Sequence, residues 1–157
     1  MTRSSNTPTP ARPRVITVIA VAAALVAAVL AAPSVRQAAG APGGTISPIT
    51  FTATTQNGRP VGAARSFAAG TRRICAVFRF AGLRAADRLE GRWLRNGQRL
   101  FVQSTTLEEV FGPRFPGNGR LWFWIEWEGG ATPGTYRFEL RLNGQPARTG
   151  TFTVRPP

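Results

Sequence analysis

Apolar residues follow two different patterns along this chain. Residues 15–32 (VITVIAVAAALVAAVLAA) form one continuous apolar run without a charged residue. From residue 49 onward, apolar and polar residues instead alternate in about seven short runs. A long continuous run favours a helix that crosses a membrane, whereas alternation with a period of two is typical of half-buried β-strands. The sequence therefore predicts one N-terminal transmembrane or signal helix followed by an all-β body.

The apolar run matches the thickness of a bilayer. Its 18 residues would span about 27 Å as a helix, close to a hydrocarbon core of about 30 Å. Arginines precede the run, so its N-terminal side is expected to stay in the cytoplasm. Small residues follow it, as signal peptidase prefers, but Pro33 and Pro42 would disfavour cleavage at the nearest sites. An uncleaved anchor and a removed signal both remain open.

These patterns divide the chain into four segments. We expect a short cytoplasmic tail at 1–14, the anchor or signal segment at 15–32, a linker rich in Pro, Gly and Ala at 33–45, and one folded domain at 46–157. All 20 basic residues are arginine, a bias typical of a GC-rich bacterial genome. The predicted location is the bacterial cell membrane, single-pass with the C-terminal domain outside; secretion after cleavage is the alternative.

Turn residues separate the strand-like runs. Asn96-Gly97 and Asn143-Gly144 each lie between two runs, and Asn-Gly is the strongest short signal for a hairpin. Pro133-Gly134 marks a further turn. The stretch 104–118 is the longest irregular region, expected as a loop or a loop with an edge strand, and no segment after residue 44 has a helical period. Short strands punctuated in this way indicate a sandwich or a small barrel.

The C-terminal third resembles a known family. The run ATPGTYRFELRLNGQPARTGTFTV is similar to the closing hairpin of immunoglobulin-like and fibronectin-III-like modules, in which a Pro-Gly turn leads to a tyrosine, here Tyr136. The resemblance implies that its hydroxyl bonds back to nearby backbone and that Trp93 is the buried core tryptophan. It implies an immunoglobulin-like antiparallel β-sandwich of about seven strands. Phe138 occupies the position of the second cysteine of antibody-type domains, which argues against such a disulfide.

The single cysteine, Cys75, excludes a disulfide within the chain. Because Ile74, Ala76 and Phe78 form the apolar face of its run, Cys75 is expected to point outward. It is interpreted as a partly covered free thiol, with an intermolecular disulfide as the alternative.

Several catalytic chemistries lack their residues. The chain has no histidine and no lysine, which excludes histidine-dependent triads and Schiff-base chemistry, and one cysteine cannot build a zinc site. Glu126 and Glu128 share a strand face about 7 Å apart, a spacing that a glycosidase could use, but charges facing arginines are the simpler interpretation. We therefore expect no enzyme, no cofactor and no metal.

Two tryptophans stand out in the run RLWFWIEW. Leu121, Phe123 and Ile125 fill its inward face, so Trp122 and Trp124 are expected on the outer face. Exposed aromatic rings mark interfaces, and they also stack on sugars. The candidate partner or glycan surface comprises Trp122, Trp124, Arg79, Arg137 and Arg141. The sequence leaves open whether residues 104–118 cover the rings, and whether the arginines flank them or lie on another sheet.

Charge completes the functional expectation. Residues 45–157 contain 16 arginines and 7 acidic residues, a net charge of +9, which would attract anionic polymers. The predicted function is a membrane-anchored, extracytoplasmic, non-catalytic binding or structural module of the bacterial cell envelope. Its expected partners are the membrane through 15–32 and a protein or glycan outside the cell, with no specific nucleic acid. The alternatives are a carbohydrate-binding module, a secreted soluble domain, and a binder of anionic polymers through arginines.

Overall fold

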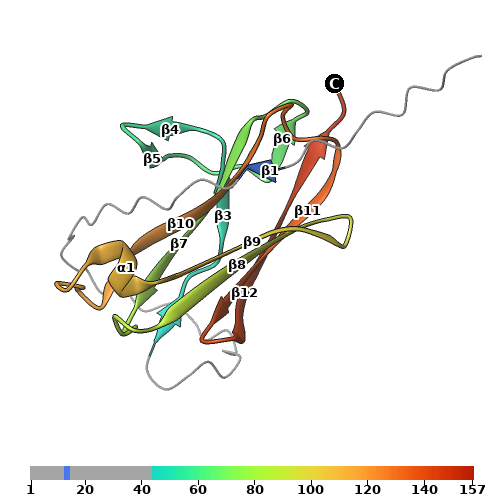
Figure 1. The fold of residues 1–157 in the computed structure, drawn as a ribbon. Helices are drawn as coiled ribbons and strands as arrows, with labels where there is room; N and C mark the ends of the chain where they lie inside the picture. Colours follow the sequence, from blue (N-terminus) through green and yellow to red (C-terminus); the bar gives the residue numbers. More distant parts are fainter. Residues whose placement is uncertain (1–12, 15–43) are drawn as a thin grey trace, which may run out of the picture.

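The computed structural model describes residues 13–14 and 44–157, and most of the described chain is β-strand (Figure 1). The prediction of an all-β body is confirmed. The predicted N-terminal helix and most of the tail and linker lie outside the described residues. Within the described part, no helix has the length and apolar character needed to cross a membrane.

The strands form two five-stranded sheets and one separate hairpin (Figure 1). The first, called sheet A, has the order β1-β10-β7-β2, and β3 also pairs with β7. Its strands are β1 (Pro13–Arg14), β2 (Thr45–Ile46), β3 (Thr50–Thr52), β7 (Arg73–Ala81) and β10 (Asn118–Trp127).

The second sheet, called sheet C, has the order β6-β12-β11-β8-β9. Its strands are β6 (Ser66–Ala68), β8 (Arg88–Arg95), β9 (Gln98–Thr106), β11 (Gly134–Leu142) and β12 (Gln145–Arg155). The short strands β4 (Thr55–Gln56) and β5 (Arg59–Pro60) pair only with each other. Strands β6 and β12 pair in parallel, and every other pair among the described strands is antiparallel.

One hydrophobic core lies between the two sheets. The alternating apolar residues of β7 and β10 meet those of β8, β11 and β12 in a single cluster. Trp93 of β8 is fully buried there, with its ring centroid 4.6 Å from that of Phe138. Burial therefore follows the alternation read from the sequence, because each sheet turns its apolar face toward the other.

Hairpins close at Asn-Gly turns. Asn96 and Asn143 have φ near +48° and +49°, and the glycine after each also has a positive φ. Two consecutive residues in this region form the turn that matches the twist of a tight hairpin. Asn57-Gly58 closes the β4–β5 hairpin in the same way, with φ of 50° and 73°. The sequence analysis did not predict this third hairpin, although it carries the same dipeptide.

Tyr136, at the start of β11, anchors the connection that precedes its strand. Its hydroxyl donates to the carbonyl oxygen of Thr132 at 2.8 Å. Its ring is fully buried and stacks on Phe152 of β12, with centroids 4.9 Å apart. The hydrogen bond satisfies a polar group that would otherwise be buried without a partner.

The stretch 104–118 differs from the sequence prediction, because it contains the helix α1 (Leu107–Phe111) between the end of β9 and the start of β10. The Thr106 side chain accepts from the Glu109 backbone N–H, and the Glu109 carboxylate accepts from the Thr106 backbone N–H. The hydrogen bond from the Thr106 backbone, followed by the one from the Thr105 hydroxyl, lowers the pKa of Glu109. A helix of five residues is too short to show a hydrophobic period, so the sequence signal for this helix was the capping pair of Thr106 and Glu109.

Candidate functional site

Trp122 and Trp124 lie on the outer face of sheet A, as the alternation predicts. They are paired across the sheet with Val77 and Cys75 of β7, and the four side chains form a hydrophobic cluster separate from the main core. The exposed fractions of Trp122 and Trp124 are only 5% and 7%. The sequence left open whether the two rings are covered, and in the structure they do not form an exposed platform.

The β4–β5 hairpin contributes to this burial. Thr52 of β3 donates through its hydroxyl to the Val61 carbonyl at 2.5 Å, and Arg120 of β10 donates to the Pro60 carbonyl at 2.8 Å. Strands β3 and β10 lie on either side of β7, so these bonds hold Pro60 and Val61 over the outer face at Val77. Pro60 is itself buried. The sequence signal for this hairpin was Asn57-Gly58, a turn that the sequence analysis did not predict.

The segment 104–118, which the sequence suggested as a cover, packs elsewhere. The rings of Phe111 and Phe115 lie 5.7 and 5.8 Å from the ring of Phe80. Phe80 belongs to the main core between the sheets, not to the cluster around the two tryptophans. Residues 107–115 therefore close the end of the main core.

Cys75 points outward from β7 as predicted, but it is buried rather than partly covered, with 2% of its surface exposed. Burial raises the pKa of its thiol to about 11, because the thiolate would lose its solvation. A neutral, covered thiol is a poor nucleophile, and it is not accessible for an intermolecular disulfide.

The carboxylate of Glu126 faces an arginine, as the sequence analysis interpreted it. Arg73 Nη2 lies 2.6 Å from Glu126 Oε1, and the same guanidinium lies 5.9 Å from the ring centroid of Trp124. Arg73 thus neutralises the carboxylate at the edge of the buried cluster. Glu126 therefore forms an ion pair with Arg73 and does not form the pair of carboxylates that a glycosidase would use.

The candidate arginines divide between the two sheets. Arg79 is exposed on β7 of sheet A, in register with Arg120. Arg137 and Arg141 lie on β11, where they alternate with core residues and so point away from sheet A. The sequence-predicted surface is therefore not one site: its tryptophans and Arg79 lie on one outer face, and Arg137 and Arg141 lie on the opposite one.

The outer face of sheet C gathers further arginines that the sequence analysis did not single out. We call this surface the basic face; it comprises Arg88, Arg92, Arg99, Arg137 and Arg141 together with Glu90 and Glu139. Five arginines against two glutamates leave a local charge of +3. Only strand register could reveal the set, because its members come from the β8–β9 hairpin and from β11, which lies much further along the chain.

Ion pairs account for two of these arginines. Arg92 Nε lies 2.6 Å from Glu90, and Arg137 Nη2 lies 2.9 Å from Glu139. The other three form no ion pair among the described residues, although Arg88 interacts electrostatically with the Glu109 carboxylate. Arg88 donates to the Ser104 hydroxyl at 2.7 Å, and Arg141 donates to the Gly144 carbonyl at 2.9 Å. These neutral partners orient the guanidinium groups of Arg88 and Arg141.

Metal-ligating residues are not gathered anywhere in the described part of the chain. Within 13–14 and 44–157, no group of three His, Cys, Asp or Glu side chains lies close enough together to hold a metal ion.

Comparison with known proteins gives a weak structural likeness. No family model matches the chain, and no curated protein matches it. Among solved structures, the chain is similar to the Pseudomonas fluorescens alkylpurine DNA glycosylase AlkC bound to DNA containing an abasic site analog, with a TM-score of 0.44 and 13% identity. The match covers 71% of this chain and 30% of that chain.

Two sequence-based predictions are corrected by this comparison. The chain was expected not to be an enzyme, and the similar structure is one. The expected partners were a membrane, a protein or glycan outside the cell, and no specific nucleic acid, whereas the similar protein binds DNA. Neither prediction is retained. A TM-score of 0.44 assigns neither that activity nor that ligand to this chain.

Proposed function

We propose that residues 46–157 form an immunoglobulin-like β-sandwich of the bacterial cell envelope whose basic face binds a linear phosphodiester polymer. The excess positive charge on the outer face of sheet C, where Arg88, Arg99 and Arg141 form no ion pair among the described residues, is the observation that carries the binding proposal.

Three features of the fold support the immunoglobulin-like assignment. The first is the bond from the Tyr136 hydroxyl to the Thr132 backbone, at the start of the penultimate strand. The second is Trp93, fully buried between the sheets. The third is the short strand β6, which pairs in parallel with the last strand while its neighbours are antiparallel. Together these features match the corner tyrosine, core tryptophan and two-sheet layout of that architecture.

The geometry of the basic face suits a polymer better than a single small anion. Neighbouring strands of a sheet lie about 4.8 Å apart, and residues two apart on one strand lie about 6.7 Å apart. The arginines are therefore spread over a surface and do not converge on one point. Arginine binds phosphate through two parallel hydrogen bonds, and a phosphodiester polymer supplies one such group per repeat.

The test removes together the three arginines of the basic face that form no ion pair. The full chain and the variant Arg88→Gln/Arg99→Gln/Arg141→Gln are titrated against a labelled single-stranded oligonucleotide and a glycerol phosphate polymer over a range of salt concentrations. The matched control, Arg59→Gln/Arg79→Gln/Arg114→Gln, removes the same charge from exposed arginines outside the basic face.

We expect the basic-face variant to bind more weakly, with a salt slope reduced by about 2, since each phosphate contact contributes about 0.7 on a single strand. The control should keep most of the slope. Binding of both polymers supports recognition of the phosphodiester group, and binding of one identifies its source. Equal losses in the two variants, or stronger binding to polyglutamate than to either phosphodiester polymer, would refute the proposal.

Export of the domain through residues 15–32 is a separate part of the proposal. N-terminal sequencing of the chain recovered from cells tests it: a first residue beyond 32 supports a secreted form, and an intact N-terminus in the membrane fraction supports the anchor. Recovery of the intact chain in the cytosol would contradict both.

A further inference from the structure

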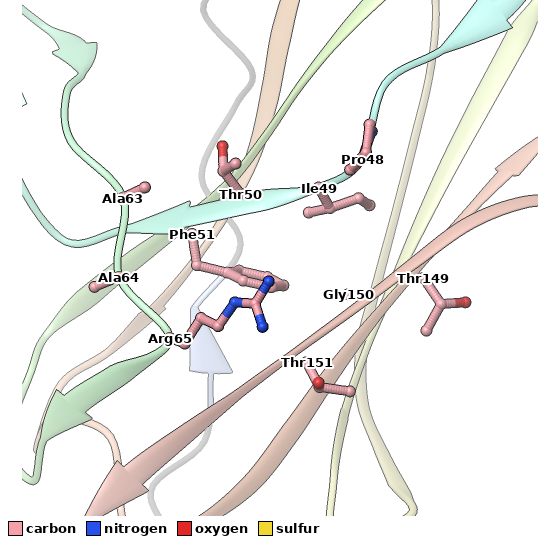
Figure 2. A pocket seen from close by; sticks show the side chains of 10 residues that line it. All are labelled: Pro48, Ile49, Thr50, Phe51, Ala63, Ala64, Arg65, Thr149, Gly150 and Thr151. Carbon is pink, nitrogen blue, oxygen red and sulfur yellow. The ribbon is translucent and has the colours of Figure 1, made fainter. Parts of the chain in front are cut away.

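The two sheets leave an opening along one side of the body, between β3 and β12 (Figure 2). The cavity there has a volume of about 500 Å³ and is lined by residues 48–51, 63–65 and 149–151. This volume is within the range of about 300–1,000 Å³ that is typical of ligand sites. Neither the sequence-predicted site nor the basic face includes this opening.

Both ends of the opening are closed by hydrogen bonds, at one end through residues 64–65 and at the other directly between the sheets. At one end, the Ala64 backbone N–H donates to the Phe51 carbonyl at 2.7 Å, and the Arg65 carbonyl accepts from the Thr153 N–H at 3.0 Å. At the other end, Arg148 Nε donates to the Ile46 carbonyl at 2.7 Å. The opening is therefore a slot of defined length that runs beside β12.

The β12 edge of this slot carries free backbone groups. The N–H of Thr153 and the carbonyl of Arg155 both point toward β6, where they bond to Arg65 and Ala69. Backbone groups alternate in direction along a strand, so those of Thr149 and Thr151 point the same way. Strand β6 begins only at Ser66, in register with Thr153. Within the described residues, Thr149 and Thr151 therefore have no strand partner on this side.

The floor and rim of the slot differ in chemistry. Ile49 and Phe51 lie under the β12 edge, because a Cβ built on Gly150 would lie 3.1 Å from Ile49 and 2.9 Å from the Phe51 ring. Figure 2 shows the Arg65 side chain at the rim beside Phe51. Arg65 is exposed, and its guanidinium makes no hydrogen bond or ion pair within 13–14 and 44–157. An apolar floor with one unpaired cation at the rim suits a segment with apolar side chains and a carboxylate.

We propose that this slot binds an extended acidic peptide, which adds to sheet C as a strand along β12 where β6 leaves off. The backbone of the peptide pairs with Thr149 and Thr151, an apolar side chain contacts Ile49 and Phe51, and a carboxylate pairs with Arg65. Strand addition of this kind draws affinity from main-chain hydrogen bonds and specificity from alternate side chains. The site is independent of the basic face, since it uses the edge of the sheet and none of the five arginines there.

The experiment uses the full chain and a labelled, acetylated seven-residue peptide of alternating valine and threonine with one central glutamate. Binding is followed by fluorescence anisotropy, and amide hydrogen exchange is measured at Thr149 and Thr151. Two further peptides carry N-methyl groups on alternate backbone amides, one in each of the two registers, and a fourth peptide has lysine in place of glutamate. The protein variants are Arg65→Gln, Thr151→Pro and the matched control Arg114→Gln, which removes the same charge from an exposed arginine outside both proposed sites.

We expect fast exchange at Thr149 and Thr151 in the free protein and slower exchange with the peptide bound. Arg65→Gln and the lysine peptide should each weaken binding about tenfold, the loss of one charge-assisted hydrogen bond. N-methylation in one of the two alternate registers should abolish binding. Because this comparison uses the parent protein, it tests the proposal even if Thr151→Pro fails to fold. Arg114→Gln should bind like the parent. Unchanged exchange at both threonines with millimolar peptide would overturn the proposal, as would equal losses in Arg65→Gln and Arg114→Gln.

Discussion

Gly91 of β8 provides the sharpest test of how the core is packed. It lies on the inner face, in register with Leu140 of β11, and is buried. A Cβ at this position would lie 2.7 Å from two ring atoms of Phe138 and 3.2 Å from Phe123. The Phe138 ring is fully buried and held against Trp93, so it has little room to swing away. Gly91→Ala should therefore overpack the core.

The expected cost follows from two opposing effects. Overpacking a well-filled core costs about 1–3 kcal/mol. Gly91 does not have a positive φ, so alanine also restricts the unfolded chain and recovers about 0.4–1 kcal/mol. The net expectation for Gly91→Ala is a loss of about 1–2 kcal/mol in the free energy of unfolding.

The measurement is urea unfolding of the full chain, followed by tryptophan fluorescence and analysed by linear extrapolation. A Phe138→Leu variant shortens the facing side chain, and a double-mutant cycle then isolates the steric term. Gly91→Ala should cost at least about 1 kcal/mol less in the Phe138→Leu background than in the parent. The reasoning is refuted if Gly91→Ala leaves the stability unchanged, or if its cost is the same in both backgrounds.

Two further predictions concern buried polar groups. Tyr136→Phe removes the bond to the Thr132 carbonyl and should lower the free energy of unfolding, measured in urea, by about 1 kcal/mol. An unchanged free energy of unfolding would mean that this bond does not stabilise the connection before β11. Burial raises the folded pKa of Cys75 from 9.0 to about 11, so its contribution to stability is complete below pH 9 and is lost as the pH rises toward 11. Unfolding measured across that range should show a steeper loss in the parent than in Cys75→Ala, and parallel losses would contradict the burial of this thiol.

Much of the fold follows from local chemistry that the sequence displays. Alternation assigned Ile74, Phe78 and Phe123 to the core, because a residue on a pleated strand must face one side or the other. Asn96-Gly97 and Asn143-Gly144 predicted their hairpins, because few other dipeptides accept two consecutive positive φ values. The helix α1 was missed because five residues are fewer than two turns, and hydrophobic periodicity needs more.

The candidate site was harder to predict, because alternation gives the face of a residue but not what covers it. Trp122 and Trp124 were placed on the correct face, yet both are buried, and the β4–β5 hairpin is bonded over the same face through Thr52 and Arg120. The pairing of distant strands likewise decided that Arg137 and Arg141 lie on the opposite outer face from the tryptophans.

The sequence by itself thus determined the all-β class, the strand faces and the turns at two Asn-Gly pairs, since these depend on neighbours within a few residues. Only the tertiary structure decided which strands are adjacent, which arginines share a surface, and that β12 keeps an open edge above Ile49 and Phe51. The physical reason is that strand order and cover are set by contacts between residues far apart in the chain. The local alternation of apolar and polar residues does not specify those contacts.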